Sequence, residues 1–399
     1  MIEDIELDAR FAQDPEALYR RLRLEAPVTR VTIGEGVRAY LVTRYADALA
    51  LLKDPRLIKE RARAEAHFEP GRAQPFATPL TRHMLGLDPP EHTRLRRLVV
   101  QAFTSRAVEG LQPRVEAIAD GLLDGVDERE QSGPVDLMAN FAEPLPLLVI
   151  SEMFDMPDTL SAPFRTALGP LIKNASREDK ATAEAECTEI LEELIDHKRR
   201  QPGDDLLTAL IHASVEGSQL THEELLSMCF LLVGAGYETT VNLVGNGMLA
   251  LCDHPSQMQL VREHPEYLPN AIEEMLRFDG PINNATLRYS MSEIVVGDVV
   301  IPPNEIVLIT LLSANRDTAR FTDPEAFDVR RRTQGHLAFG HGIHHCVGAP
   351  LARMEGVTAI GRLLARYTTI ALDRSEPLEY HDSTLIRGLK RLPLWLTKS

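Results

Sequence analysis

The 399-residue sequence predicts an α+β protein dominated by helix. Three observations support this prediction. Helical periodicity fills residues 85–280, short alternating apolar segments lie toward both ends, and no internal repeat or low-complexity linker divides the chain. A hydrophobic fraction of 44% and a charged fraction of 26% are ordinary for a soluble globular protein with a sizeable core. We expect a single domain over residues 1–399, with β-rich parts at about 27–45 and 285–399.

The first elements follow from alternation and turn residues near the N-terminus. The string VTRVTI-GEG-VRAYLVT, which begins at Val28, predicts a β-hairpin with a glycine-containing turn. A short helix is expected over residues 45–53. Residues 61–85 are rich in Pro, Arg and Ala and show no clear period, so we expect a long loop. Long loops in compact proteins are often functional.

A strong helix start follows in the string DPPEHTRLRRLVVQAF. Asp88 is expected to cap this helix, Pro89 suits its first turn, and Glu91 completes a capping box. The chain should then remain mostly helical until the Gly280-Pro281 pair, because neither residue continues a helix well.

The C-terminal part combines short strands with one more helix. The strings ATLRYS, EIVVGDVVIP and EIVLITLLSA alternate as strands do. The last helix is expected from about Ala349 to Arg366, and the alternating leucines of LKRLPLWLTK predict a final strand.

Charge and cysteine usage exclude several classes of protein. A formal net charge of -16 argues against nucleic acid or an anionic membrane as the main partner. The acidic N-terminal segment lacks the apolar core of a signal peptide or an anchor. Polar residues interrupt the apolar run Leu225 to Cys252, which predicts a buried helix and no membrane span. Four scattered cysteines without a CxxC pair indicate reduced thiols, so we expect a cytoplasmic protein.

The string HLAFGHGIHHCVGAPLARME concentrates metal-binding residue types. A plain glycine-rich turn is the simplest interpretation. Zinc fits poorly, because His344, His345 and Cys346 are adjacent and cannot all converge on one tetrahedral ion. A haem iron needs only one proximal protein ligand, so a single cysteine suffices. Gly342 and Gly348 bracket that cysteine, and the positive end of the helix that follows would favour a thiolate.

The segment FGHGIHHCVG resembles the cysteine-loop signature of the cytochrome P-450 superfamily, Phe-Gly-x-Gly-x-His/Arg-x-Cys-x-Gly, at every fixed position. The resemblance extends from the hairpin to the tail. It implies the P-450 fold, a triangular helical prism with small β-sheets near both chain ends. It also implies haem b with its iron bound axially by Cys346, and O2 as co-substrate. Further haem contacts are expected from Phe339, Gly340, Gly348 and Ala235.

The string VGAGYETTVN lies inside the long apolar helix. It is almost a GxGxxG dinucleotide motif, but the third glycine is missing and no strand precedes it. Glycine and threonine that merely pack in a core helix are the other alternative. The string resembles the oxygen-binding groove of the superfamily, and this implies that Glu238 and Thr239 deliver the protons needed to split the O–O bond.

Two further strings resemble the parts of the superfamily that hold the haem propionates. In DPPEHTRLRR, His92 and Arg96 lie four residues apart and share one side of the helix. A solvated basic face is the alternative. The resemblance implies that His92, Arg96, Arg288 and His344 surround the propionates, which guanidinium groups can bind in a bidentate manner.

The string AIEEMLRFDGP places Glu274 and Arg277 three residues apart on a helix. Most isolated pairs of this kind are surface salt bridges of little value. Here the pair matches the Glu-x-x-Arg element of the superfamily, which implies a structural network with Arg330 as the third partner.

Substrate contacts are carried over from the resemblance. They include the 61–85 loop, the region Pro163 to Ala185, and the residues Leu232, Val233, Ala235, Gly236, Thr239, Ile282, Asn283, Ala285 and Leu385. Much of this list is apolar, which favours a hydrophobic substrate. We expect a macrolide or polyketide first and a steroid-like molecule second. Hydroxylation is the expected outcome, although epoxidation uses the same chemistry.

Electrons must come from a partner, because the chain has no flavin or nicotinamide motif. The resemblance suggests a ferredoxin with its ferredoxin reductase, acting on a monomer that binds no nucleic acid and no membrane. A basic docking patch is expected from Arg94, Arg97, Arg331, Arg332 and Arg353. A non-catalytic haem carrier and a zinc-stabilised binding protein are the rival interpretations, and peroxide-driven oxidation is an alternative route.

Overall fold

The computed structural model describes residues 5–60, 83–128, 133–172 and 177–398, in which the Cα atoms group into two units. Unit 1 comprises Met1–Pro75, Asp120–Ala142 and Thr239–Ser399, and unit 2 comprises Phe76–Ala119 and Glu143–Glu238. Most of the predicted 61–85 loop, residues 61–82, lies outside the described part of the chain.

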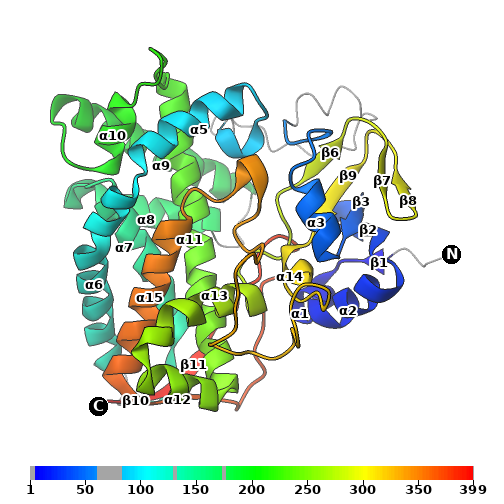
Figure 1. Cartoon of the computed structure of the whole chain (residues 1–399). Helices are drawn as coiled ribbons and strands as arrows, with labels where there is room; N and C mark the ends of the chain where they lie inside the picture. Colours follow the sequence, from blue (N-terminus) through cyan, green and yellow to red (C-terminus); the bar gives the residue numbers. More distant parts are fainter. Residues whose placement is uncertain (1–4, 61–82, 129–132, 173–176, 399) are drawn as a thin grey trace. The chain divides into compact units, whose positions relative to one another are not determined.

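The predicted hairpin is present and belongs to a six-stranded sheet in unit 1 (Figure 1). Strands β2 (Val28–Ile33) and β3 (Val37–Val42) pair antiparallel, with Val28 opposite Val42. The sheet order is β1-β2-β3-β9-β6-β4. Its other strands are β1 (Ile5–Glu6), β4 (Leu57–Ile58), β6 (Arg288–Ser290) and β9 (Ile306–Ile309). Because β3 pairs parallel with β9, the sheet joins segments from the two ends of the chain.

Short helices accompany this sheet. They are α1 (Ala9–Gln13), α2 (Pro15–Glu25), α3 (Tyr45–Leu51) and α14 (Leu311–Ala314). The prediction that EIVLITLLSA is a strand throughout is wrong, because β9 ends at Ile309 and α14 begins two residues later. The hydroxyl of Thr310 accepts a hydrogen bond from the Ser313 N–H, and this cap starts the helix.

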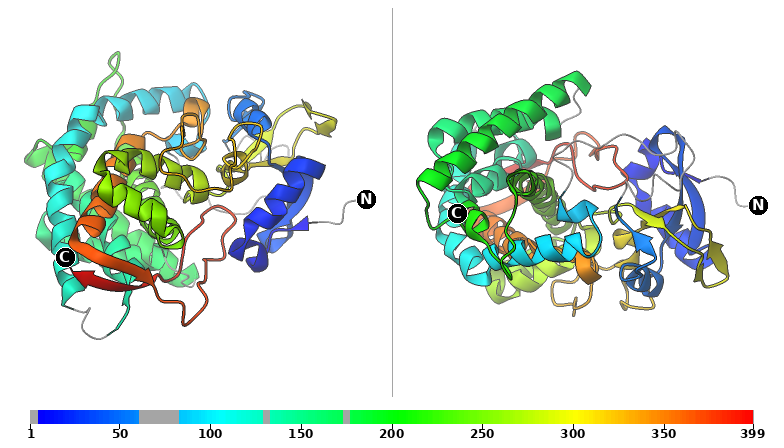
Figure 2. Two further views of the ribbon diagram at one scale, coloured as in Figure 1. Left: turned by 60° about the horizontal axis from the view of Figure 1, so that its bottom comes forward. Right: turned by 90° about the horizontal axis from the view of Figure 1, so that it is seen from above.

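Two smaller sheets complete the strands of unit 1. Strands β7 (Ile294–Val296) and β8 (Val299–Ile301) form a hairpin. Strand β11 (Pro393–Lys398) lies between β10 (Tyr367–Leu372) and β5 (Val135–Asp136), and Figure 2 shows β10 and β11 side by side. The predicted alternation of the tail is confirmed, because Leu394 and Leu396 are buried and Trp395 is exposed.

The helices of unit 1 include α12 (Pro255–Glu263), α13 (Leu268–Asp279) and α15 (Ala349–Arg366), with short turns at Met138–Ala142, Pro265–Tyr267 and Gly342–His344. Helix α15 has the predicted bounds and runs beside α13 (Figure 1). Their approach is close at Gly356, where a Cβ would lie 3.1 Å from Leu243 and 3.2 Å from Ile272. The middle of α15 is therefore packed closely against Leu243 of α11 and Ile272 of α13.

Unit 2 is helical among its described residues. A single turn, Met84–Gly86, precedes α5 (Glu91–Ala102). The other helices are α7 (Pro144–Met153), α8 (Asp158–Ile172), α9 (Arg177–Arg200) and α10 (Leu206–His212), whereas α6 (Ser105–Asp127) begins in unit 2 and ends in unit 1. The predicted capping of α5 by Asp88 is wrong. Pro90 is the N-cap residue, and the Asp88 backbone carbonyl accepts the His92 N–H at 3.0 Å.

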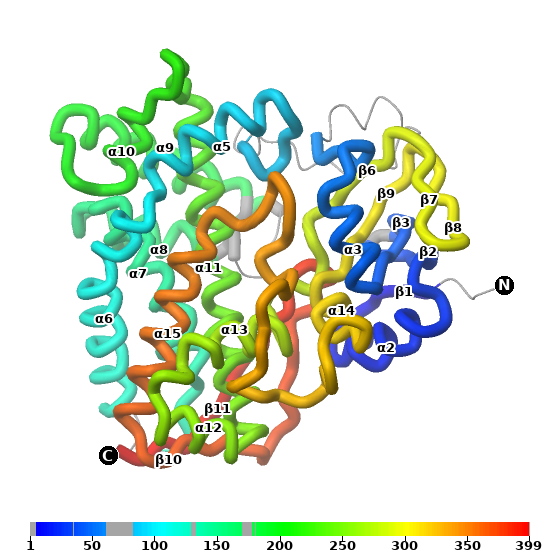
Figure 3. Tube along the Cα trace, in the orientation of Figure 1, coloured from blue at the N-terminus to red at the C-terminus, as the bar shows by residue number. Residues whose placement is uncertain are grey.

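Helix α11 (His222–Asp253) is the long helix that the apolar run predicts (Figure 3). It begins in unit 2 and ends in unit 1. By length and composition it is the one helix among the described residues that could cross a membrane. Two thirds of its apolar window, 67%, is buried inside the structure. Such burial is typical of the core helix of a soluble protein.

Glu355 on α15 is an acidic side chain in the core. Its side chain is only 3% exposed, and its Oε2 atom has no hydrogen-bond partner among the described residues. Burial raises the pKa of Glu355 to about 8, because the interior disfavours the charged carboxylate. The folded protein therefore binds this proton more tightly than the unfolded chain, whose carboxyl keeps a pKa near its ordinary 4.5.

This shift predicts a pH-dependent stability. The stabilisation is complete below the unfolded pKa of 4.5 and is lost as the pH rises through the folded value of about 8. Between about pH 5 and pH 8.5 we expect the melting temperature of the wild type to fall relative to that of Glu355→Gln. Differential scanning calorimetry at several pH values in this window measures the melting temperatures of both proteins. Glu379→Gln, at an exposed carboxyl whose pKa Lys390 lowers, should follow the wild type. Equal slopes for the wild type and Glu355→Gln would contradict the assignment.

Candidate active site

The cysteine loop of unit 1 is a tightly folded turn before α15. Its 3-10 turn ends at His344, and Gly348 is the N-cap of α15, whose first turn contains Pro350 as predicted. The Cys346 N–H donates to the Phe339 carbonyl at 2.9 Å. Gly340 and Gly342 have φ values of +68° and +76°. This left-handed backbone favours glycine, so both residues are needed for the path of the loop.

Cys346 differs from the other three cysteines in exposure. Its side chain is exposed at the N-terminal end of an 18-residue helix. Cys187 and Cys229 are buried, and burial raises the pKa of each thiol to about 12, as it does for Cys252. Thiols of that kind stay protonated and inert. Cys346 is therefore the cysteine placed to act as a thiolate ligand.

The VGAGYETTVN string forms an accessible turn within α11. Gly234 and Ala235 are exposed although Val233 and Tyr237, on either side, are buried. Glu238 and Thr239 are half-buried in the following turn. Burial raises the pKa of the Glu238 carboxyl above its ordinary value. A carboxyl that gains a proton at a higher pH than usual is suited to proton transfer near neutrality.

The four side chains expected around the propionates come from three kinds of element. His92 is buried on α5, and Arg96 follows one turn later. Arg288 is buried at the start of β6 and donates to the Thr286 carbonyl at 3.1 Å. His344 is half-buried in the cysteine loop. One exposed thiol together with cationic and hydrogen-bonding side chains is a donor set that fits a haem and its two carboxylates.

The structure brings together the segments of unit 1 that are expected to contact substrate. Ile282 pairs with Ile386 in an isolated β-bridge, and the Asn283 N–H donates to the Leu385 carbonyl at 2.9 Å. Ala285 donates to Ile309 of β9 at 2.8 Å. The Asn283 side chain, however, is buried and accepts a hydrogen bond from the Tyr19 hydroxyl at 2.6 Å. Asn283 therefore positions the Leu385 segment from inside the core.

Not all of the expected substrate residues are equally open to a ligand. On α11, Ala235 is exposed and Leu232 and Gly236 are half-buried, whereas Val233 is buried. A Cβ at Gly236 would lie 3.8 Å from Ile150, an ordinary packing distance. The 61–82 part of the expected loop and residues 173–176 lie outside the described residues.

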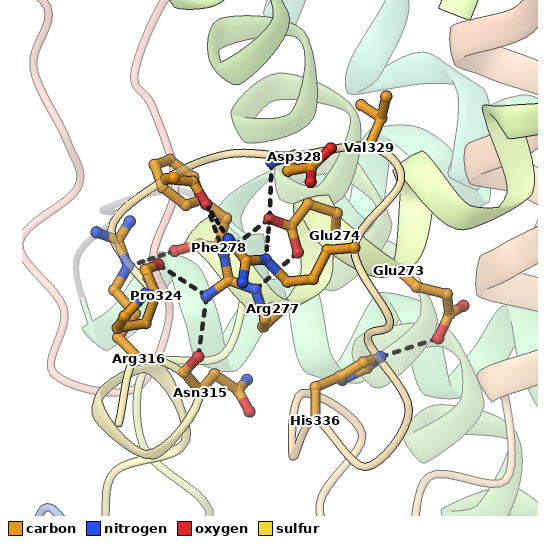
Figure 4. Close-up of polar contacts among 12 residues, drawn as sticks. Glu273, Glu274, Arg277, Phe278, Asn315, Arg316, Pro324, Asp328, Val329 and His336 are labelled. Atoms are coloured by element: carbon orange, nitrogen blue, oxygen red, sulfur yellow. Dashed lines mark hydrogen bonds and ion pairs between the residues drawn. The ribbon is translucent and has the colours of Figure 1, made fainter. Parts of the chain in front are cut away.

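The Glu274–Arg277 pair is fully buried, with both side chains 0% exposed (Figure 4). Arg277 holds Glu274 in a bidentate pair, with Nε–Oε2 and Nη2–Oε1 distances of 2.7 and 2.8 Å. Its remaining N–H groups donate to the carbonyls of Asn315, Pro324 and Ala326. All five guanidinium donors are thus used, and this satisfaction is what permits the charge to be buried.

The third member of this network is Arg331, and the prediction of Arg330 is wrong. Arg331 Nε donates to Glu274 Oε1 at 3.0 Å, and its side chain is 12% exposed. The Arg330 side chain is 60% exposed and lies near Asp328. A turn explains the difference, because the Arg330 N–H bonds the Asp328 side chain and the Arg331 N–H bonds the Asp328 carbonyl. This turn aims the second of three consecutive arginines inward.

The expected basic docking patch is also altered. Arg331 is committed to Glu274 and to the carbonyls of Thr322, Asp323 and Ala326. Arg353 makes a bidentate ion pair with Glu273 but remains 41% exposed. Arg331 therefore leaves the set of residues that could meet a partner, and Arg353 stays in it.

The chain is similar to known proteins over nearly its whole length. The family model for cytochrome P450 matches residues 145–393. Cytochrome P450 107B1 of Saccharopolyspora erythraea is 47% identical over 97% of this chain and 96% of its own length. The 6-deoxyerythronolide B hydroxylase of the same organism is 40% identical over 99% of each chain. Among solved structures, the ligand-free P450 monooxygenase TamI matches with a TM-score of 0.90 and 42% identity, covering 98% of this chain and 94% of that one. TamI with tirandamycin C bound matches with a TM-score of 0.86.

The Arg331 assignment predicts unequal effects of two neighbouring substitutions. Arg331→Gln removes one partner of a buried carboxylate and should lower the free energy of unfolding by about 2–4 kcal/mol. Arg330→Gln removes an exposed charge and should change it by less than about 0.5 kcal/mol. Urea denaturation followed by circular dichroism measures both values. Equal losses, or a larger loss for Arg330→Gln, would return Arg330 to the network.

Proposed function

The chain belongs to the cytochrome P450 family, and from this premise we propose that it hydroxylates a large lipophilic natural product of the macrolide or polyketide type. Membership makes it a haem-thiolate monooxygenase with O2 as co-substrate and a separate source of electrons. The exposed Cys346 thiol at the start of α15 is the observation that carries the proposal for this chain. When bound, the haem supplies the activation of O2, with one oxygen atom entering the substrate and the other leaving as water.

Cys346 is proposed as the thiolate that would bind the haem iron. The loop is fixed by the hydrogen bond from its N–H to Phe339 and by the two glycines with positive φ. The N-terminal end of α15 carries a partial positive charge, which stabilises a thiolate over a thiol. Phe339, Gly340, Gly348 and Ala235 are proposed to line the haem. This arrangement supports ligation of a metal by sulfur without a second protein ligand.

Glu238 and Thr239 are proposed to move protons during oxygen activation. The raised pKa of Glu238 keeps a proton available closer to neutral pH than an ordinary carboxyl would. The hydroxyl of Thr239, the next residue on α11, can both donate and accept a hydrogen bond. A carrier or sensor of haem needs no such pair, and this supports catalysis over storage.

The haem propionates are proposed to bind His92, Arg96, Arg288 and His344. Arg288 and His344 belong to unit 1, whereas His92 and Arg96 belong to unit 2. We propose that residues 1–399 form a single catalytic domain. The continuity of α11 from one unit into the other supports this proposal.

The substrate is proposed from the apolar side chains and from the relatives. Leu232, Ile282 and Leu385 offer apolar surface, which suits a lipophilic molecule. One relative is named for hydroxylating 6-deoxyerythronolide B, and TamI has been solved with tirandamycin C. A steroid-like substrate is the alternative, and epoxidation is the alternative outcome. Electrons are proposed to come from a ferredoxin and its reductase, delivered to a monomeric cytoplasmic enzyme.

The spectrum of the reduced protein under carbon monoxide tests the ligand. The wild type should show a strongly red-shifted Soret band, because a thiolate donates electron density to the iron. Cys346→His should bind haem without that red shift, whereas Cys252→Ser should behave as the wild type. Titration with 6-deoxyerythronolide B, tirandamycin C and progesterone should then give a low-spin to high-spin shift with a macrolide or polyketide compound. No Soret band after haem supplementation would refute the assignment.

Thr239→Ala tests the proton delivery. We expect oxygen consumption to continue while the amount of product per O2 consumed falls roughly ten- to hundredfold, because the hydroxyl that delivers protons for O–O cleavage is lost. The neighbouring Thr240 is buried on the same helix and provides a matched control. Thr240→Ala should keep the wild-type ratio. An unchanged ratio in Thr239→Ala, measured with an oxygen electrode and product quantification, would remove Thr239 from the mechanism.

A further inference from the structure

A second polar cluster of unit 1 lies beside the cysteine loop and was not expected from the sequence. Glu273, on α13 immediately before Glu274, accepts two hydrogen bonds from Arg353 of α15, at 2.5 Å from Nε and 3.0 Å from Nη2. Its Oε2 also pairs with His336 Nε2 at 2.9 Å (Figure 4). One carboxylate thus ties together α13, the start of the cysteine loop and the first turns of α15.

The chemistry of these contacts is consistent with a permanent anion. Burial alone would raise the pKa of Glu273, but the hydrogen bonds from His336 and Arg353 outweigh burial and lower it to about 2. His336 Nδ1 accepts the Ala338 N–H at 3.2 Å, which leaves Nε2 as the donor to Glu273. The His336 ring therefore bridges the carboxylate and the backbone of the loop.

Phe339 connects this cluster to the ligand. The Arg353 guanidinium lies over the Phe339 ring, 4.5 Å from its centroid, a distance that allows a cation–π interaction. The rings of His336 and His345 lie at 6.0 and 6.4 Å from the same ring. The carbonyl of Phe339 accepts the Cys346 N–H. A displacement of Arg353 would therefore be transmitted through Phe339 to the cysteine.

We propose that Glu273 is a positioning residue for the Cys346 thiolate, acting through His336 and through the Arg353 guanidinium over Phe339. This inference rests on the proposed function, since it assumes a haem bound by Cys346. The carboxylate fixes the position of the loop, and the opposite charges of Glu273 and Arg353 balance each other beside the ligand. A glutamine can accept fewer strong hydrogen bonds and leaves the arginine charge uncompensated.

The balance of charges gives a readout that a purely structural role would not move. A nearby positive charge stabilises the reduced haem, so Glu273→Gln should shift the reduction potential upward and Arg353→Gln should shift it downward. Loss of packing alone would shift the reduction potentials of both variants in the same direction. Spectroelectrochemical titration of the haem-loaded full chain measures the two shifts.

The stability of the ligand bond gives a second readout. In the reduced protein under carbon monoxide, we expect the red-shifted Soret band of Glu273→Gln to convert to an unshifted band about tenfold faster than in the wild type, because hydrogen bonds to a charged group are lost. Arg353→Lys keeps the positive charge but cannot make the bidentate hydrogen bonds to Glu273. Its conversion rate should therefore fall between those of the wild type and Glu273→Gln. These variants keep the test valid if Glu273→Gln folds poorly.

Asp127→Asn is the matched control. Asp127 binds the side chains of Arg366, Tyr367 and Lys398 at the other end of α15, so its loss destabilises the same unit away from the cysteine. It should leave both the potential and the conversion rate unchanged. Potential shifts of the same sign in Glu273→Gln and Arg353→Gln, or an equally fast conversion in Asp127→Asn, would overturn the inference. Absence of the red-shifted band in the wild type would overturn the proposed function as well.

Discussion

The buried ion pair of Glu274 and Arg277 is the constraint on which the region around the cysteine depends. Removing two charges from water costs several kcal/mol per ion unless every donor and acceptor is satisfied. Here the guanidinium satisfies its five N–H groups with one carboxylate and three backbone carbonyls. The segment from Asn315 to Arg331 must therefore follow α13 closely. That segment leads directly into the cysteine loop, so the ion pair sets the starting point of the loop.

Helix α13 also contacts the loop of Cys346 through a second set of side chains. Glu273, the residue before Glu274, binds His336 and Arg353. Ile272 packs against Gly356 of α15. Three consecutive side chains of one helix thus contact the segment Asn315 to Arg331, here called the meander, the cysteine loop and the following helix. A rigid helix that serves three segments keeps their relative positions fixed at small entropic cost, because its own backbone is already ordered.

Local patterns were sufficient for much of the fold. The hairpin, α15 and the last strand follow from alternation, glycine and proline, which act over a few residues. The cysteine loop was predicted from its resemblance to a family signature, and of the two glycines that bracket Cys346 only Gly342 has a positive φ. The role of Arg331 was not predictable, because the segment has no helical or strand periodicity that would indicate which of three consecutive arginines points inward. The Glu273–Arg353 pair was missed, because 80 residues separate its members and each alone resembles a surface charge.

The arginines of the buried network bind the meander mainly through its backbone. Arg277 and Arg331 donate to the carbonyl oxygens of Asn315, Thr322, Asp323, Pro324 and Ala326, and these contacts involve no side chain of those five residues. A carbonyl is present at every position whatever the amino acid. The course of this segment therefore depends on two guanidinium groups, those of Arg277 on α13 and Arg331 at the end of the segment, and on the Glu274 carboxylate. The exposed side chains of this segment can therefore be substituted without moving the Cys346 thiol.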